Sequence, residues 1–189
     1  MRTIKINIYE FDELSNEAKE KAIEKERELK QEGWYYDDSN DCLTEGFNER
    51  LKELGFDDIK LTWDCSYGQG DYFYIEAGVD LNDKFLEKHN LTKYKEVIPH
   101  IYGCSVNKSY VYIDLDIEIE DEDLGELFEQ LVEKKVDNLK GELQIIVDDL
   151  ARKFKKEAYE EYEYRLSDEC IVEDMENNGG EFEEDGTRA

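Results

Sequence analysis

Residues 110–120 form a strictly alternating stretch, Tyr110-Val-Tyr-Ile-Asp-Leu-Asp-Ile-Glu-Ile-Glu120, that decides the fold. Side chains of a β-strand point alternately to opposite faces, so the pattern predicts a strand with one aliphatic and one acidic face. The aliphatic positions are Val111, Ile113, Leu115, Ile117 and Ile119. The other face carries the acidic ladder, which we define as Asp114, Asp116, Glu118 and Glu120.

The hydrophobic period changes directly after this stretch. From Glu122 onward, apolar residues recur every three or four positions, which predicts an amphipathic helix reaching about Tyr164. Its apolar positions are Leu124, Phe128, Leu131, Val132, Val136, Leu139, Leu143, Ile146 and Leu150. A strand followed by a long helix indicates an α+β protein.

Upstream, the sequence predicts a strand over residues 1–9, a helix over 16–31 capped by Ser15, and a second helix ending at Gly55. Residues 59–63 and 71–79 suggest one hairpin, and residues 101–106 pair with the ladder strand in another. We therefore expect an antiparallel sheet of about four to five strands packed against long helices on one face. Residues 1–176 are expected to form a single α+β domain, and 177–189 an acidic, flexible tail.

The chain is strongly acidic. It has 51 Asp and Glu residues against 24 Lys and Arg residues, a net charge of −27 over 189 residues. This charge excludes direct binding to nucleic acid or to an anionic membrane, because phosphates would be repelled. It favours a basic partner, such as a nucleic-acid-binding protein, a basic toxin or a basic peptide.

The compartment is predicted from the absence of two kinds of signal. The chain has no apolar run long enough to span a bilayer, and its first residues do not form a signal peptide. Its four cysteines are widely spaced, without a Cys-x-x-Cys pair, which fits a reducing cytoplasm.

The acidic ladder is the first candidate binding site. Same-face residues of a strand lie roughly 6.6–6.8 Å apart. This spacing resembles that of phosphates along a nucleic-acid strand, so the ladder could imitate nucleic-acid charge. Asp121 and Asp123 extend its rim, and Tyr110 and Tyr112 share its face, where they could stack on arginine side chains. The alternative is an ordinary acidic solvent face.

The second candidate is the end of the first hairpin, which brings Trp63, Tyr67, Gln69 and Asp71 together. Loops often carry function, and Trp and Tyr are favoured interface anchors. The alternative assigns glycines to the turn and packs the aromatic side chains beneath the sheet.

No motif indicates catalysis. The sequence has no phosphate-binding loop, no calcium loop and no nucleophile elbow. Neighbouring same-face acids on one strand are too far apart to hold a two-metal centre alone. We therefore expect no catalytic residues, no metal and no cofactor.

Several ordered blocks of the chain resemble a family of small acidic phage-encoded proteins. These blocks are Phe11-Asp-Glu-Leu-Ser15, Glu17-Ala-Lys-Glu-Lys-Ala-Ile23, Trp34-Tyr-Tyr-Asp-Asp38, Leu54-Gly-Phe-Asp-Asp58, Ser66-Tyr-Gly-Gln-Gly-Asp71, Glu161-Tyr-Glu-Tyr-Arg-Leu-Ser-Asp-Glu169 and Gly180-Glu-Phe-Glu-Glu-Asp-Gly186. The chain departs from the family's usual Ser-Gln-Gly-Asp-Gly turn. The resemblance implies phage biology, and members are sometimes labelled antitoxin-like.

Charge and resemblance together predict a non-enzymatic, phage-encoded inhibitor. It would bind a host nucleic-acid-binding defence protein, in the cytoplasm of the bacterial host, by mimicking nucleic-acid charge. One alternative is an antitoxin-like protein that neutralises a small basic toxin. Another is a phage protein that assembles with itself through its long helices. The sequence leaves the oligomeric state open.

Overall fold

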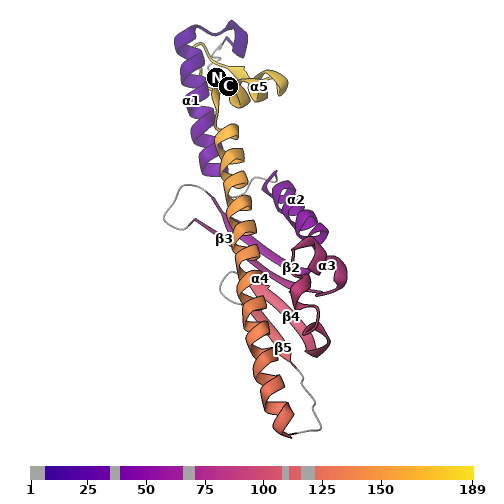
Figure 1. Cartoon of the computed structure of the whole chain (residues 1–189). Helices are drawn as coiled ribbons and strands as arrows, with labels where there is room; N and C mark the ends of the chain where they lie inside the picture. The colour runs from indigo at the N-terminus through magenta and orange to yellow at the C-terminus, as the bar shows by residue number, and fades with distance from the viewer. Residues whose placement is uncertain (1–6, 35–38, 66–70, 108–110, 116–121) are drawn as a thin grey trace, which may run out of the picture. The chain divides into compact units, whose positions relative to one another are not determined.

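The computed structural model describes residues 7–34, 39–65, 71–107, 111–115 and 122–189, and it divides the chain into two compact units (Figure 1). The terminal unit comprises Met1–Asp38, Cys65–Gly68 and Glu157–Ala189, and the sheet unit comprises Ser39–Asp64 and Gln69–Lys156. The expected single domain is therefore replaced by two units. The physical reason is that the first and last segments of the chain pack on each other and form a core of their own.

The sheet unit contains a four-stranded antiparallel sheet in the order β2-β3-β4-β5. Its strands are β2 (Phe56–Asp64), β3 (Tyr72–Val79), β4 (Ile101–Asn107) and β5 (Val111–Leu115). Its helices are α2 (Ser39–Glu53), α3 (Asp83–Lys88) and the larger part of α4 (Glu122–Arg165), with 3-10 turns η3 (Thr92–Tyr94) and η4 (Ile98–His100). The predicted α+β class, both hairpins and the long helix are confirmed.

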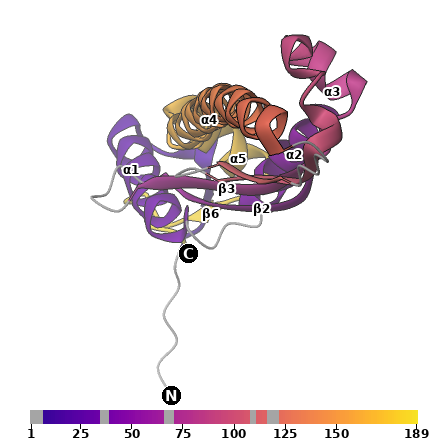
Figure 2. The same ribbon diagram turned by 60° about the horizontal axis from the view of Figure 1, so that its bottom comes forward.

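One face of this sheet is covered by helices. The ring of Phe47 on α2 stacks on Phe154 of α4 with 4.7 Å between centroids, and lies 5.6 Å from Phe73 of β3. Figure 2 shows α4 lying across one face of β2 and β3. The buried residues of α4 in this unit recur at helical spacing: Val132, Val136, Leu139, Leu143, Val147, Ala151 and Phe154. Four of them were predicted apolar positions, whereas the predicted Ile146 and Leu150 are half-buried and Leu131 is 57% exposed.

The terminal unit is built from α1 (Asn16–Gly33), the end of α4, α5 (Asp168–Asn177) and a short antiparallel pair of β1 (Tyr9–Glu10) with β6 (Glu181–Phe182). A 3-10 turn, η1 (Phe11–Glu13), joins β1 to α1. The Ser15 side chain caps α1 by accepting a hydrogen bond from the Ala18 amide, and Ser167 caps α5 in the same way. Both helix starts follow from the preference for serine at the N-cap.

The carboxyl-terminal segment corrects a second expectation. Residues 177–189, expected to be an acidic flexible tail, contain β6 and the fully buried Phe182, which packs 6.0 Å from the Phe11 ring. Gly186 turns the chain with φ of +82° so close to α1 that a Cβ there would clash with the Ala18 carbonyl oxygen. Phe182 and Gly186 thus pack residues 177–189 against α1 and η1, although the acidic composition of this segment predicted a flexible tail.

The amino-terminal strand also differs from its prediction. Residues 1–6 lie outside the described residues; of the described residues 7–10, Ile8 is exposed rather than buried and Tyr9–Glu10 form a strand. Among the described residues, no helix is both long enough and apolar enough to cross a membrane.

Replacing Phe182 with alanine tests the packing of the carboxyl-terminal segment. Loss of a buried phenylalanine should lower the free energy of unfolding of the terminal unit by about 3–5 kcal/mol. Urea denaturation followed by circular dichroism would measure it, with the exposed Glu184→Ala as control. An effect of Phe182→Ala as small as that of the control would show that the segment does not pack as described.

Candidate protein-binding surface

The face of the sheet opposite α2 and α4 is polar and exposed. Along β3 the residues alternate, because Phe73, Ile75, Ala77 and Val79 are buried while Tyr72 is 41% exposed. The strand register places Thr62 beside Tyr74, Lys60 beside Glu76, and Ser105 beside Tyr112. We call this surface the open face: Asp57, Lys60, Thr62, Asp64, Tyr72, Tyr74, Glu76, Gly78, Ser105 and Tyr112.

Three of its side chains form a hydrogen-bonded group centred on Glu76. The Lys60 Nζ donates to Glu76 Oε1 at 2.6 Å, and the Tyr74 hydroxyl donates to Glu76 Oε2 at 3.0 Å. The Lys60 hydrogen bond, then that of Tyr74, holds the pKa of the Glu76 carboxyl below its ordinary value. The same Lys60–Glu76 hydrogen bond raises the pKa of the Lys60 ammonium. Glu76 is therefore an ionised acceptor already occupied by a cation.

Asp57 is placed on the open face by an irregularity in β2. The pairing of β2 with β3 shifts between Asp57 and Lys60, where Asp58 adopts φ of +44°. Asp57 pairs with Gly78, and a Cβ built on Gly78 would clash with Asp57 Oδ1 and lie 3.2 Å from its Cγ. The carboxylate therefore lies over the β3 backbone, in space that the glycine leaves open.

The sequence did not place Asp57 in the sheet, because the strand was expected to begin at Ile59. The available signal was Gly78, a glycine inside a strand pattern, which often marks the close approach of another group. A β-bulge cannot be read from alternation, because its extra residue breaks the period of two.

The acidic ladder is described only at its beginning. Tyr112, on the predicted acidic face, is 56% exposed, and its side chain is the only one described between residues 111 and 115. Asp114 lies in β5 opposite Gly103, and Asp123 lies in the first turn of α4, but their side chains are outside the description. Outside the described residues lie Tyr110, Asp116, Glu118, Glu120 and Asp121. The ladder as a surface stays a prediction.

Two of the four residues of the second candidate site, Trp63 and Asp71, are described, and Trp63 does not lie on the open face. The Trp63 ring lies 6.4 Å from Phe73 and 6.2 Å from Phe47, and its Nε1 donates to Thr44 Oγ1 at 3.0 Å. These contacts belong to the helix-covered face, as in the alternative that packs the aromatic side chains beneath the sheet. Asp71 is half-buried at the start of β3, and Tyr67 and Gln69 lie outside the described residues.

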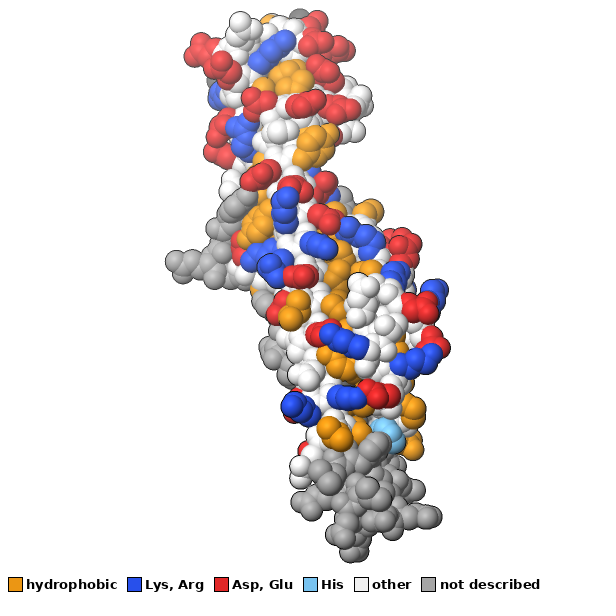
Figure 3. Space-filling view, viewed as in Figure 1, with side chains coloured by type: hydrophobic (Ala, Val, Ile, Leu, Met, Phe, Trp, Pro, Cys, Tyr) orange, Lys and Arg blue, Asp and Glu red, His pale blue; other side chains and the backbone are white. Residues whose placement is uncertain are grey.

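Negative charge is distributed unevenly. The terminal unit has 24 acidic against 9 basic residues, and the sheet unit has 27 against 15. Between Glu129 and Lys156, in contrast, α4 carries six acidic and seven basic residues. On the face seen in Figure 3, acidic side chains gather over the terminal unit, and Lys and Arg side chains are frequent along the middle of α4. The four exposed acids Glu17, Glu20, Glu28 and Glu32 lie at helical spacing on α1.

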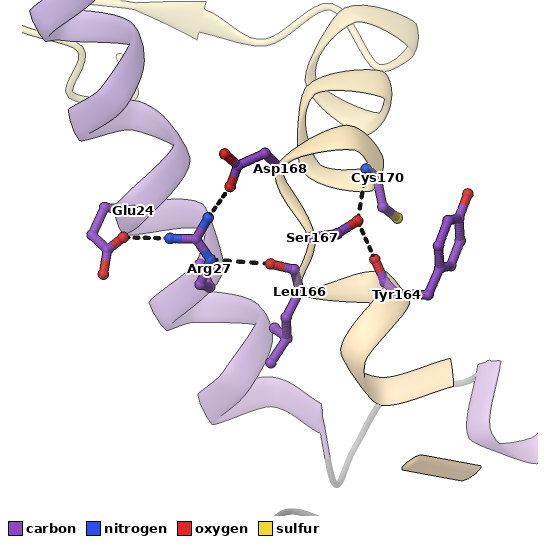
Figure 4. Close-up of polar contacts among 7 residues, drawn as sticks. All are labelled: Glu24, Arg27, Tyr164, Leu166, Ser167, Asp168 and Cys170. Carbon is purple, nitrogen blue, oxygen red and sulfur yellow. Dashed lines mark hydrogen bonds and ion pairs between the residues drawn. The ribbon is translucent and has the colours of Figure 1, made fainter. Parts of the chain in front are cut away.

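The described cations of the terminal unit mostly join its elements. Arg27 on α1 pairs with Glu24 and Asp168 and donates from Nε to the Leu166 carbonyl oxygen at 3.0 Å, which ties α1 to the turn between α4 and α5 (Figure 4). Lys30 pairs with Asp174 of α5 at 2.5 Å. Other pairs are Lys19–Asp12, Lys21–Asp185, Arg165–Glu161 and Arg188–Glu26.

Of the four cysteines, Cys65 and Cys170 are buried, Cys104 is half-buried and Cys42 is exposed. Burial raises the pKa of the Cys104 thiol to about 12, so it stays protonated near neutral pH. His89 Nε2 lies 2.8 Å from the Leu54 carbonyl oxygen, with its ring 4.3 Å from Phe85. The described part of the chain has no group of three or more His, Cys, Asp and Glu that could hold a metal ion.

Comparisons with protein-family models, with curated proteins and with solved structures find no match to this chain. The resemblance to small acidic phage proteins therefore stays a prediction.

Replacing Lys60 with methionine tests the group centred on Glu76. Without the Lys60 ammonium, the pKa of Glu76 should rise towards its ordinary value, since the largest cause of its depression is gone. Stability from this pair is present above the ordinary carboxyl pKa and lost as pH falls, so Lys60→Met should flatten the acid limb of the stability profile. Carbon-13 NMR titration would report the pKa, with the exposed Lys84→Met as control. An unchanged Glu76 midpoint would contradict the pairing.

Proposed function

We propose that this chain is a non-enzymatic, phage-encoded inhibitor that binds a basic, nucleic-acid-binding defence protein in the cytoplasm of the bacterial host. Its carboxylates would occupy the arginine and lysine side chains with which that partner normally contacts phosphates. The observation that supports this most is the position of the acidic ladder. Its first residue, Asp114, lies in β5, the last strand in the order β2-β3-β4-β5, which pairs only with β4 among the described residues.

An edge strand suits this role for a geometric reason. Acids on one face of an extended strand are spaced roughly 6.6–6.8 Å apart, and at an edge a partner can approach from the face and from the side. A net charge of −27 would steer a basic protein towards the chain and repel nucleic acid. Association should therefore be fast at low salt and weaken as salt screens the charges.

Self-assembly is the second candidate, because α4 exposes two large aliphatic side chains. Leu131 is 57% exposed and Ile145 is 61% exposed. They are fourteen residues apart, which places them on nearly the same side of a helix with 3.6 residues per turn. Measurement of the mass in solution would separate this candidate from a monomeric inhibitor.

Neutralising the acidic ladder tests the proposed function. The variant Asp114→Asn, Asp116→Asn, Glu118→Gln and Glu120→Gln should fold but capture its partner about tenfold less tightly or worse, since charge-assisted contacts are lost. A matched variant on α1, Glu17→Gln, Glu20→Gln, Glu28→Gln and Glu32→Gln, removes the same charge and should keep most of the affinity. Capture from bacterial lysate, elution by a salt gradient and mass spectrometry would measure both.

We expect to recover a DNA- or RNA-binding protein. Addition of free nucleic acid should displace this protein from the chain. Equal capture by the ladder variant and the α1 variant, at low and at physiological salt, would show that the ladder is only a solvent face. Recovery of a small basic toxin would favour the antitoxin-like alternative instead.

A further inference from the structure

Asp57 is an exposed carboxylate on the open face of the sheet. No hydrogen bond or ion pair joins it to any described residue, whereas the neighbouring Glu76 is occupied by Lys60 and Tyr74. It is held over Gly78, above the backbone of an inner strand. A partner that lies on this face would therefore meet a negative charge that the fold has not neutralised.

Across the sheet from Asp57, the next two residues on the open face are a glycine and a serine, and the third is a tyrosine. The register runs from Gly78 on β3 to Ser105 on β4 and then to Tyr112 on β5. Neighbouring strands lie about 4.8 Å apart, so Gly78 and Tyr112 are separated by roughly 10 Å. A long, flexible side chain reaching down between them could contact the Asp57 carboxylate and the exposed Tyr112 ring together.

We propose that the open face binds an arginine-bearing segment of the basic partner, with Asp57 receiving the guanidinium and Tyr112 stacking beside it. This inference rests on the proposed function, because it identifies the chemistry of the same partner. Among the described residues, the open face carries Asp57, Asp64 and Glu76 against one cation, Lys60, and the whole chain has a net charge of −27. Its charge is thus complementary to a basic segment.

Arginine fits this surface better than lysine. A guanidinium is planar, presents two parallel donors to one carboxylate and stacks on aromatic rings, whereas an ammonium is a strongly hydrated point charge. A carboxylate and a tyrosine on the same face of the sheet therefore favour arginine by chemistry as well as by charge. A second copy of this chain would bring another −27 to the interface, which opposes self-pairing on this face.

Calorimetric titration with hexa-arginine and hexa-lysine peptides at physiological salt tests this inference. The wild-type chain should bind hexa-arginine more tightly than hexa-lysine. Asp57→Asn should weaken hexa-arginine binding about tenfold, while weakening hexa-lysine binding less. Glu32→Gln on α1, an exposed change of equal charge, should leave the preference for arginine intact.

Gly78→Ala gives a second test without any change of charge. The new Cβ would displace the Asp57 carboxylate, which is the free end of a rotatable side chain, so the sheet should keep its fold. This variant should lose the arginine preference as Asp57→Asn does, with an unchanged circular dichroism spectrum.

Three results would overturn the inference. Equal binding of the two peptides by the wild-type chain would remove the selectivity for arginine. Unchanged hexa-arginine binding in both Asp57→Asn and Gly78→Ala would show that Asp57 does not bind the arginine side chain. A dimer of the free chain that Asp57→Asn dissociates would assign the face to a second copy. The proposed function fails separately, because the acidic ladder variant tests it by capture of the nucleic-acid-binding protein, a measurement in which Asp57 is unchanged.

Discussion

The apolar stripe of α4 is the constraint on which both units depend. Over its 44 residues the helix supplies Val136, Leu139, Leu143 and Phe154 to the core of the sheet unit. It then supplies Ala158 and Tyr162 to the terminal unit, where Tyr162 lies 4.8 Å from the Trp34 ring. A helix of this length does not hold its stripe by propensity alone, because most helical stability in proteins comes from packing of the amphipathic face. Each unit therefore stabilises its own part of α4.

Because α2 and α4 cover one face of the sheet, the side chains that point to the other face are not part of the core. Every second residue of β3 enters the aromatic and aliphatic core, so the residues between them are turned away from the helices. Those residues are tyrosines, a glutamate and a glycine rather than aliphatic side chains. Tyrosine combines a large apolar ring with a hydroxyl, which suits a surface that is wet when free and covered when bound. The open face follows from the packing, and its composition is the reason why we propose it as a binding surface.

The sequence predicted those features that depend on period and on local capping. Alternation identified both hairpins, the 3.6-residue period identified α4, and Ser15 marked the start of α1. Phe182 was missed because one aromatic residue among acids carries no periodic signal. The terminal unit was missed because the contacts that define it join residues more than 130 positions apart, as between Arg27 and Leu166. Asp57 was missed because its position depends on a bulge and on a glycine of the next strand.

The described basic residues of the terminal unit form ion pairs that orient its elements. Its ion pairs join different elements: Lys21 pairs with Asp185, Lys30 with Asp174, and Arg27 with Asp168. Each exposed pair contributes only about 0–1 kcal/mol, so these pairs orient the elements more than they stabilise the fold. Because the cations are used between elements, the excess acids remain on the surface. Their mutual repulsion disfavours the free state, and a basic partner would relieve it on binding. Part of the binding free energy would thus come from relief of the repulsion that the acidic side chains exert on one another in the free chain.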